Sequence, residues 1–476
     1  MLTYTFEEKG KKTYYQYLYE RIRDDILEGK LIAGTRLPSK RSFAKHLGLS
    51  VMTIESAYAQ LLVEGYLFSV EKKGYYVADI SKQGQFPIKR PYQIESQDGL
   101  GRREKAQGKD QEQQEELFMD FSSNQVSREH FPMSAWSRLM RHVLAEQDGI
   151  VLQPGPHQGL WELREAIARH LYRFRGMEVQ PEQIVIGAGT EYLYHLLIQL
   201  LGRDKVYGIE NPGYQKLARI YERNDVQFRY LDLDQEGLSV EALKRSGVQV
   251  VHTSPSHHFP TGIVMPIKRR QELLDWVYQE ERYIIEDDYD CEFRFSGLPI
   301  PTLQSIDTMG RVIYLNTFSK SLTPSIRISY MVLPLRLLNR YREKLGFYAC
   351  TVSNFEQYTL EAFLREGYFE KHINRMRTYY RNKRNTVVRA IKKSGLAKRA
   401  DILEEDAGLH FLLRIHTEVS DEALKQRLEK QGIRIRCLSD YSYYHNPFYE
   451  HMFVVNYTGL AEERLPGAME RILKCV

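Results

Sequence analysis

Short apolar runs alternate with amphipathic helical segments from Leu117 to the end of the 476-residue chain, and this alternation restricts the fold more than any other feature. The apolar runs cover residues 184–186, 206–209, 248–252, 283–285, 311–315 and 328–333. Helical periodicity fills intervals between them, at residues 192–201, 214–224 and 269–279. Strands joined through helices pair in parallel, with the helices on the faces of the sheet. The pattern therefore predicts an α/β domain around a mostly parallel sheet, which binds ligands at the carboxyl ends of its strands.

Two of the predicted strand ends carry residues that suit a planar, anionic ligand. Gly187-Ala188-Gly189-Thr190 directly opens a helix, whose free amide groups form an anion site. The third glycine of a dinucleotide fingerprint is missing, which argues against NAD. Tyr214, after the next strand, is placed either to stack on a planar ring or to pack in the core.

The fourth strand ends in an acidic segment, residues 286–292, which reads Glu-Asp-Asp-Tyr-Asp-Cys-Glu. The glycine and the distal glutamate of an EF-hand loop are missing, so calcium is not expected. One carboxylate can instead face a protonated pyridine nitrogen, while the remaining acids are expected in solvent. His257-His258 lacks a third ligand at metal-site spacing, so we expect this pair to form hydrogen bonds in a loop and no metal to bind.

Lys320 lies in a turn of hydroxylated residues between two buried apolar runs, with Ser319 beside it and Arg327 shortly after. Burial and the neighbouring cation would lower the pKa of this amine, and a neutral amine forms a Schiff base with an aldehyde. Hydroxyl groups and a guanidinium also suit a phosphate. Taken alone, the segment is equally compatible with a solvated loop lysine. Together with the other strand-end residues it predicts a pyridoxal phosphate site.

Residues 118–476 resemble a fold-type I aminotransferase, through Phe318-Ser319-Lys320 and the segment 155–168. The resemblance implies that Lys320 holds pyridoxal phosphate as an aldimine. It further implies that Asp287 contacts the pyridine nitrogen, that Tyr289 contacts the phenolic oxygen and that Tyr214 stacks on the ring. Four residues would surround the phosphate: Gly189, Thr190, Ser319 and Arg327.

The first 78 residues carry the pattern of a winged helix-turn-helix. Apolar residues recur at helical spacing in the segment 14–26, where Tyr15 is the first of those expected to face inward. Ser39 begins a second helix, and Ser50 can cap a third whose inward positions include Tyr58. The short connection at residues 47–50 makes these two helices a helix-turn-helix, and runs at residues 67–70 and 75–77 form a hairpin with a basic tip. The order of the helices, the tight turn between the second and third helix and the basic hairpin tip together favour DNA binding over a plain protein-interaction module.

This region resembles the GntR-type winged helix, through residues 37–41, 47–50 and 64–67 and Lys73-Gly74. The resemblance implies that the third helix enters the major groove and that the hairpin follows the DNA backbone. Many relatives carry arginines where this chain has Val51 and Glu55, so base preference is not carried over. The residues expected to contact DNA are Arg36, Ser39, Arg41, Ser50, Thr53, Tyr58, Lys73 and Gly74.

The combination of the two regions resembles the MocR/GabR regulators. It implies a pyridoxal phosphate-dependent transcription regulator that binds promoter DNA and senses a small amino compound by forming an external aldimine at Lys320. It also implies a head-to-tail homodimer. Two alternatives stand beside it: a working aminotransferase with an accessory DNA-binding domain, and a sensor of pyridoxal phosphate itself. We expect a DNA-binding domain at residues 1–78, a flexible linker at 79–117 and the effector domain at 118–476.

The chain departs from the aminotransferase pattern in two places. Residues 259–262, Phe-Pro-Thr-Gly, replace the usual asparagine turn, and we expect a preceding histidine or serine to take the place of that asparagine. Residues 456–460 contain no arginine where such enzymes bind the substrate carboxylate, which argues against efficient turnover of α-amino acids. The candidate effector-binding residues are Lys216, Arg434 and Arg436.

Composition is that of an ordinary globular protein, with 42% hydrophobic and 27% charged residues and a net charge of +5. Polar and charged residues dominate the segment 79–117, which cannot bury enough surface to order itself and is expected to be a tether. The four cysteines form no CxxC pair, which predicts reduced thiols. The absence of an apolar signal segment and of a membrane-spanning run predicts a cytoplasmic protein.

Overall fold

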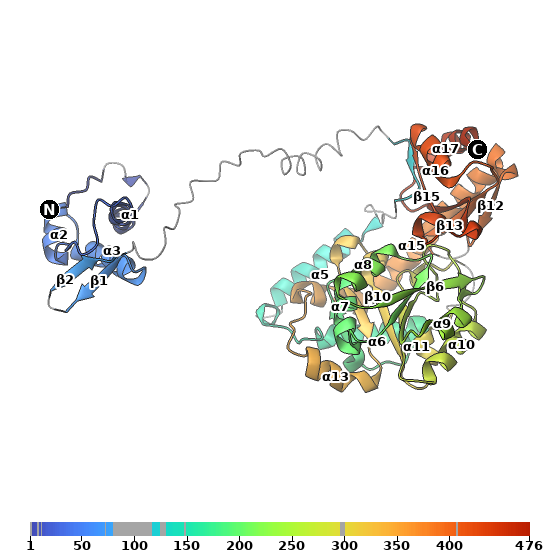
Figure 1. Ribbon diagram of the computed structural model, residues 1–476, viewed down its shortest axis with the longest axis horizontal. Helices are drawn as coiled ribbons and strands as arrows, with labels where there is room; N and C mark the ends of the chain where they lie inside the picture. Colours follow the sequence, from blue (N-terminus) through green and yellow to red (C-terminus); the bar gives the residue numbers. More distant parts are fainter. Residues whose placement is uncertain are drawn as a thin grey trace. The chain divides into compact units, whose positions relative to one another are not determined.

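The computed structural model describes residues 2–6, 9–10, 12–71, 73–79, 117–123, 130–146, 149–295, 300–405 and 408–476. They belong to two compact units, Met1–Glu112 and Gln113–Val476, which are drawn in Figure 1. Nearly all of the predicted tether, residues 79–117, lies outside the described residues.

The first unit is a winged helix-turn-helix, as predicted. Its elements are α1 (Tyr14–Leu27), α2 (Lys40–Leu47), α3 (Val51–Val63) and the antiparallel strands β1 (Leu67–Val70) and β2 (Gly74–Val77). The Ser39 hydroxyl accepts a hydrogen bond from the Ser42 amide at 3.2 Å, and the Ser50 hydroxyl accepts one from the Thr53 amide at 3.1 Å. Gly48 ends α2 with a φ of 66°, a left-handed conformation that suits glycine and allows the tight turn into α3.

One inward position of α1 differs from the prediction. Tyr17 is buried, whereas Tyr15 is exposed. Helical spacing puts Tyr15 on the same face as the buried residues Leu18, Ile22 and Ile26. Tyr15 lies in the first turn of α1, before the part of this face that the core covers, whereas the Tyr17 ring packs against the Phe6 ring, with 5.7 Å between the ring centroids.

The second unit is built around an eight-stranded sheet in the order β4-β11-β10-β9-β8-β5-β6-β7. The sheet is parallel except that β11 runs against both its neighbours and β7 runs against β6, which confirms the predicted α/β class. The six predicted strands are all present. The strands are β4 (Ile184–Gly187), β5 (Tyr207–Asn211), β6 (Phe228–Asp234), β7 (Gly237–Leu238), β8 (Val250–Thr253), β9 (Tyr283–Asp287), β10 (Val312–Thr317) and β11 (Ser329–Val332).

The strands β6 and β7 were not predicted. Along β6, buried and exposed positions alternate, and only Leu231 is fully buried. A strand near the edge of a sheet needs no continuous apolar run, which was the pattern used to find the central strands.

Helices cover both faces of this sheet (Figure 1). On one face, helices α5, α6 and α14 pack over Ile184 and Ile186, while α9 and α10 pack over Val251. On the other face, α7, α8 and α13 pack over Val185 and Val250. The helices are α5 (Met133–Glu146), α6 (Trp161–Arg175), α7 (Thr190–Leu201), α8 (Gln215–Arg223), α9 (Val240–Ser246), α10 (Ile267–Tyr278), α11 (Leu303–Ile306), α12 (Phe318–Ser321), α13 (Leu335–Leu345), α14 (Asn354–Arg365) and α15 (Tyr368–Lys393).

A smaller antiparallel sheet, in the order β12-β13-β16-β15, follows α15, and a short parallel pair joins β14 to β3. The strands are β3 (Met119–Asp120), β12 (Ala400–Leu403), β13 (His410–Ile415), β14 (Ile433–Arg434), β15 (Arg436–Cys437) and β16 (Met452–Asn456), and α16 (Asp421–Lys430) and α17 (Leu465–Cys475) pack on them. Among the described residues, no helix has both the length and the apolar character needed to cross a membrane.

Candidate functional site

A cavity of about 270 Å³ lies at the carboxyl ends of β5, β8, β9 and β10, beside the start of α7. This is the edge of the sheet that the sequence predicts for ligand binding. The cavity brings together residues from five separate segments of the chain. All eight residues predicted to bind the cofactor line it: Gly189, Thr190, Tyr214, Asp287, Tyr289, Ser319, Lys320 and Arg327.

Asp287 ends β9 with one carboxylate oxygen held and the other free. Its Oδ2 accepts a hydrogen bond from the Tyr194 hydroxyl at 2.5 Å and lies 3.6 Å from His252 Nε2. Its Oδ1 is buried and has no hydrogen-bond partner among the described residues. Leaving a buried carboxylate oxygen unpaired is costly, and a protonated ring nitrogen would supply the missing donor. The residues present therefore fit the pyridine nitrogen of pyridoxal phosphate.

Lys320 lies in the short helix α12, directly after the central strand β10. Burial lowers the pKa of the Lys320 amine, as predicted, and so favours its neutral, nucleophilic form. The prediction that a neighbouring cation contributes is not met. The charge that acts on the Lys320 pKa is the Asp290 carboxylate, which raises it.

The start of α7 and Arg327 form the anion-binding end of the cavity. Gly189 precedes α7 with a φ of 96°, and its position leaves the first amide groups of the helix without a side-chain cap. A Cβ at Gly189 would lie 2.4 Å from Arg327 Nη2, so only glycine lets the guanidinium approach the helix start this closely. Arg327 donates to the Ala188 carbonyl at 3.3 Å. A helix N-terminus beside a guanidinium fits a phosphate.

Two tyrosines form further parts of the cavity wall. Tyr214 stands at the start of α8 and is partly exposed. The Tyr289 hydroxyl lies 3.4 Å from His257 Nδ1. Burial, followed by the Asp290 and Asp287 carboxylates, raises the pKa of Tyr289 well above its usual value. Tyr289 therefore stays protonated and can donate a hydrogen bond.

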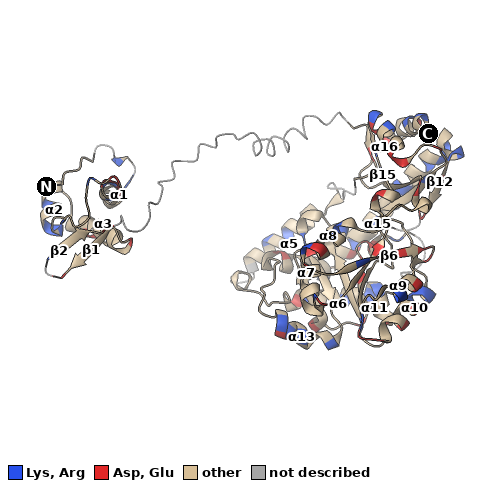
Figure 2. Ribbon diagram, viewed as in Figure 1, with Lys and Arg blue, Asp and Glu red and all other residues tan. Residues whose placement is uncertain are grey.

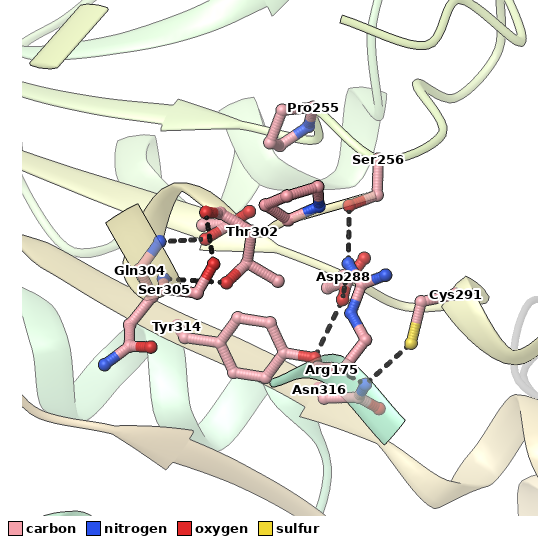
Figure 3. Close-up of polar contacts among 12 residues, drawn as sticks. Arg175, Pro255, Ser256, Asp288, Cys291, Thr302, Gln304, Ser305, Tyr314 and Asn316 are labelled. Carbon is pink, nitrogen blue, oxygen red and sulfur yellow. Dashed lines mark hydrogen bonds and ion pairs between the residues drawn. The ribbon is translucent and has the colours of Figure 1, made fainter. Parts of the chain in front are cut away.

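The prediction that the other acids after β9 lie in solvent is wrong, because all four are buried: Glu286, Asp288, Asp290 and Glu292. The Asp288 carboxylate lies 2.8 Å from Arg175 and accepts a hydrogen bond from the Tyr314 hydroxyl at 2.8 Å (Figure 3). Glu286 accepts hydrogen bonds from the two amides that begin α11. Sequence spacing does not disclose these partners, which come from distant segments.

Burial also changes the protonation of two of these acids. It raises the pKa of Glu286 to about 7, with Asp288 adding to the effect, and that of Glu292 to about 8. Glu292 Oε2 has no hydrogen-bond partner within the described part of the chain. Glu292 is thus held largely as the neutral acid near pH 7.

The predicted hydrogen-bonding role of His257-His258 is confirmed. His257 Nδ1 lies 2.9 Å from Asp290 Oδ2, and His258 Nδ1 lies 2.7 Å from Thr261 Oγ1. Of the histidines and serines in residues 254–258, Ser254 lines the cavity. Across the described ranges, no group of three or more His, Cys, Asp and Glu side chains is placed to hold a metal ion.

The sequence prediction missed several cavity-lining residues, among them Tyr194, Glu210 and His252. Tyr194 lies one helical turn after Thr190, and His252 lies near the end of a predicted strand, so the rule that selected Asp287 could also have selected His252. Glu210 is buried one residue before the Asn211-Pro212 turn and accepts a hydrogen bond from the Thr253 hydroxyl at 2.5 Å. Its hydrogen-bond partners, Thr253 and Ser254, lie at the end of the neighbouring strand β8, so the local sequence does not indicate this contact.

The candidate effector-binding residues lie outside the cavity lining. Lys216 forms an ion pair with Glu191, which does line the cavity. Arg434 lies 3.8 Å from Asp120, and Arg436 lies over the Tyr441 ring at 6.0 Å.

The structure places seven of the eight predicted DNA-contacting residues at least partly at the surface of the first unit. The exception is Tyr58, which is fully buried and whose hydroxyl donates to the Pro38 carbonyl at 3.1 Å. Tyr58 therefore packs in the core, and the prediction that it contacts DNA is wrong. Arg36 lies against Gly74, so the predicted contacts before α2 and at the hairpin are neighbours.

The gntR family of bacterial regulatory proteins matches residues 14–77, and the aminotransferase class I and II family matches residues 117–472. The HTH-type transcriptional regulator YdeL of Bacillus subtilis is 38% identical, over 91% of this chain and 90% of that protein. The probable rhizopine catabolism regulatory protein MocR of Rhizobium meliloti is 32% identical, over 91% and 88%. An archaeal alanine:glyoxylate aminotransferase structure superposes with a TM-score of 0.68 at 23% identity, covering 79% of this chain and 94% of the other, which shows the shared fold. The chain thus belongs to the MocR-type HTH transcriptional regulators, in which a gntR-family helix-turn-helix is joined to an aminotransferase class I and II domain.

Proposed function

We propose that this regulator binds promoter DNA through its winged helix and responds to a small amino compound that reaches pyridoxal phosphate on Lys320. The observation that carries the proposal is the unpartnered Asp287 Oδ1, in the same cavity as a lysine of lowered pKa. A carboxylate and a lysine amine of lowered pKa that line one cavity match the two functional ends of a pyridine aldehyde. The aminotransferase family itself implies dependence on pyridoxal phosphate.

Each residue of the cavity has a role in this proposal. Asp287 would accept a hydrogen bond from the protonated ring nitrogen while Tyr194 and His252 hold its second oxygen in place. The start of α7 and Arg327 would bind the phosphate, and Tyr214 would cover the ring. Bound there, pyridoxal phosphate supplies an aldehyde carbon that reacts with primary amines. Lys320 would hold the cofactor through its amine, and as a free amine it would accept or donate a proton beside it.

Sensing is favoured over turnover because the described cavity lining holds no lysine or arginine for a substrate carboxylate beyond Lys320 and Arg327. Asn456 begins the segment where aminotransferases carry such an arginine. It is buried, and its Nδ2 donates to the Phe121 carbonyl at 3.2 Å. A substrate with no carboxylate clamp is poorly oriented for repeated proton transfer.

The test records cofactor absorbance and DNA binding on the same samples. Full-length protein reconstituted with pyridoxal phosphate is titrated with a panel of amines, amino acids and dipeptides. One compound should change the absorbance band and the DNA affinity at the same concentration. Lys320→Ala should lose both responses, whereas Lys244→Ala, which changes an exposed lysine of α9 outside the cavity lining, should keep the absorbance change.

Other outcomes separate the alternatives. Sustained keto-acid-dependent turnover at ordinary enzymatic rates would favour a working aminotransferase. A Lys320→Ala protein whose DNA binding still follows pyridoxal phosphate concentration would favour a sensor of the cofactor.

For the assembly we propose domains at 1–78 and 118–476, a linker at 79–117 and a head-to-tail homodimer. A monomeric mass in solution by light scattering contradicts the dimer.

A further inference from the structure

The exposed start of α3 is apolar. Val51 is 43% exposed and Met52 is 73% exposed, although both directly follow the Ser50 cap of a helix whose other face is fully packed. Ile54, Ala57 and Leu61 supply that packing and leave Val51 and Met52 outside the core. These two side chains therefore form an apolar tip that the winged helix itself does not bury.

The surroundings of this tip are strongly basic. Between Thr35 and Glu55 the chain has four lysines and arginines and one acid, Glu55, which is paired with Lys40. Figure 2 shows lysine and arginine gathered on α2, the helix before the tip. Arg36, Arg41 and Lys45 are exposed. An apolar tip surrounded by positive charge is complementary to a DNA groove, where base edges lie between phosphates.

The rest of the exposed face of α3 offers few groups that hydrogen-bond to bases. It continues through Glu55, Ser56, Ala59 and Gln60, and it carries no lysine, arginine or asparagine. The Gln60 amide, which could otherwise contact adenine, donates to the Glu64 carboxylate at 2.5 Å. Glu55 is paired with Lys40 at 2.6 Å. The bidentate contacts that arginine makes to guanine and asparagine makes to adenine are therefore not available from this face.

We infer that Val51 and Met52 enter the major groove and recognise the C5-methyl groups of thymine. This inference rests on the proposed DNA binding and adds the base that is read and the residues that read it. Thymine is the base that presents an apolar group in the major groove, so it is the base an apolar helix start distinguishes. A buried methyl group changes affinity by about fourfold.

The experiment compares thymine with uracil, which differ at the groove edge only by that methyl group. Duplexes are first selected from a random-sequence library with the full-length protein. The enriched duplex is then synthesised with uracil in place of thymine, and the affinities of both forms are measured by fluorescence anisotropy. The wild-type protein should prefer the thymine duplex by about fourfold for each contacted methyl.

Variants assign this preference to the tip. Val51→Ala and Met52→Ala should each reduce the ratio of the two affinities towards one. Both sites are exposed, so the fold should persist, and thermal unfolding checks this. Val63→Ala is the matched control, because Val63 is 85% exposed at the other end of the same helix. Val63→Ala should keep the wild-type ratio.

Two results would overturn the inference while DNA binding stands: equal wild-type affinity for both duplexes, or a full thymine preference in the Met52→Ala and Val51→Ala proteins. A selection that enriches no duplex would refute the proposed DNA binding and the thymine contact with it.

Discussion

Replacing Arg175 with methionine should destabilise the second unit severely. The Arg175 and Asp288 side chains are 3% and 1% exposed, and they lie 2.8 Å apart. Arg175 also donates to the Ser256 hydroxyl at 2.9 Å (Figure 3). Methionine fills much of the same volume but leaves the Asp288 charge buried without its cation. Removing one partner of a buried ion pair costs about 3–5 kcal/mol of unfolding free energy.

The assay is urea unfolding of the full-length protein followed by tryptophan fluorescence. All three tryptophans, Trp136, Trp161 and Trp276, belong to the second unit, so the winged helix does not contribute to the signal. The control is the double variant Arg175→Met with Asp288→Asn, which removes the unpaired charge and should recover part of the lost stability. The reasoning is refuted if the single variant loses less than about 1 kcal/mol, or if the double variant is no more stable than the single one.

Three further predictions concern other parts of the molecule. Glu292 has a folded pKa of about 8, raised by burial, so its contribution to stability is fully present below its ordinary pKa and is lost as pH rises through 8. In Glu292→Gln the fall in stability between pH 5 and pH 9 should be smaller, by on the order of 3 kcal/mol in urea titrations; an unchanged pH profile speaks against the raised pKa. Gly189→Ala should weaken pyridoxal phosphate retention by about tenfold or more, measured by equilibrium dialysis, because a Cβ meets Arg327 and the backbone conformation is strained for alanine; equal retention contradicts the phosphate site. Arg41→Ala with Lys73→Ala should weaken DNA binding and reduce the slope of log affinity against log salt by about 2; a slope equal to that of the wild-type protein rejects these phosphate contacts.

The cofactor residues were predictable because they follow a topological rule. In a parallel sheet the carboxyl ends of all strands meet at one edge, so the turns that hold Gly189, Asp287 and Lys320 could be placed together from the order of strands. The choice of Asp287 among the acids of residues 286–292 came from the resemblance to fold-type I aminotransferases. The local chemistry of these turns can also be inferred from the sequence. A glycine before a helix indicates an anion site, and a lysine in a hydroxylated turn indicates a reactive amine.

The prediction for the buried acids was wrong because their burial depends on contacts between distant segments. Charged residues in sequence are expected in solvent, and only a partner from a distant segment reverses this expectation. Arg175 ends a helix more than a hundred residues before Asp288, and no spacing rule connects them. Tyr58 illustrates the point in the first unit, since its hydroxyl is satisfied by the Pro38 carbonyl inside the core.

By itself, the sequence determined the two fold classes, the helix caps at Ser39 and Ser50 and, through its resemblance to fold-type I aminotransferases, the eight residues expected around the cofactor. The fold classes and caps depend on short-range periodicity and on the order of strands, and the residue roles depend on motifs shared with that family. The tertiary structure alone decided which carboxylate oxygen is left unpaired, which acids are buried and that Val51 and Met52 form an exposed tip. Those properties depend on burial and on partners far apart in the chain, and neither is encoded in the local spacing of residues.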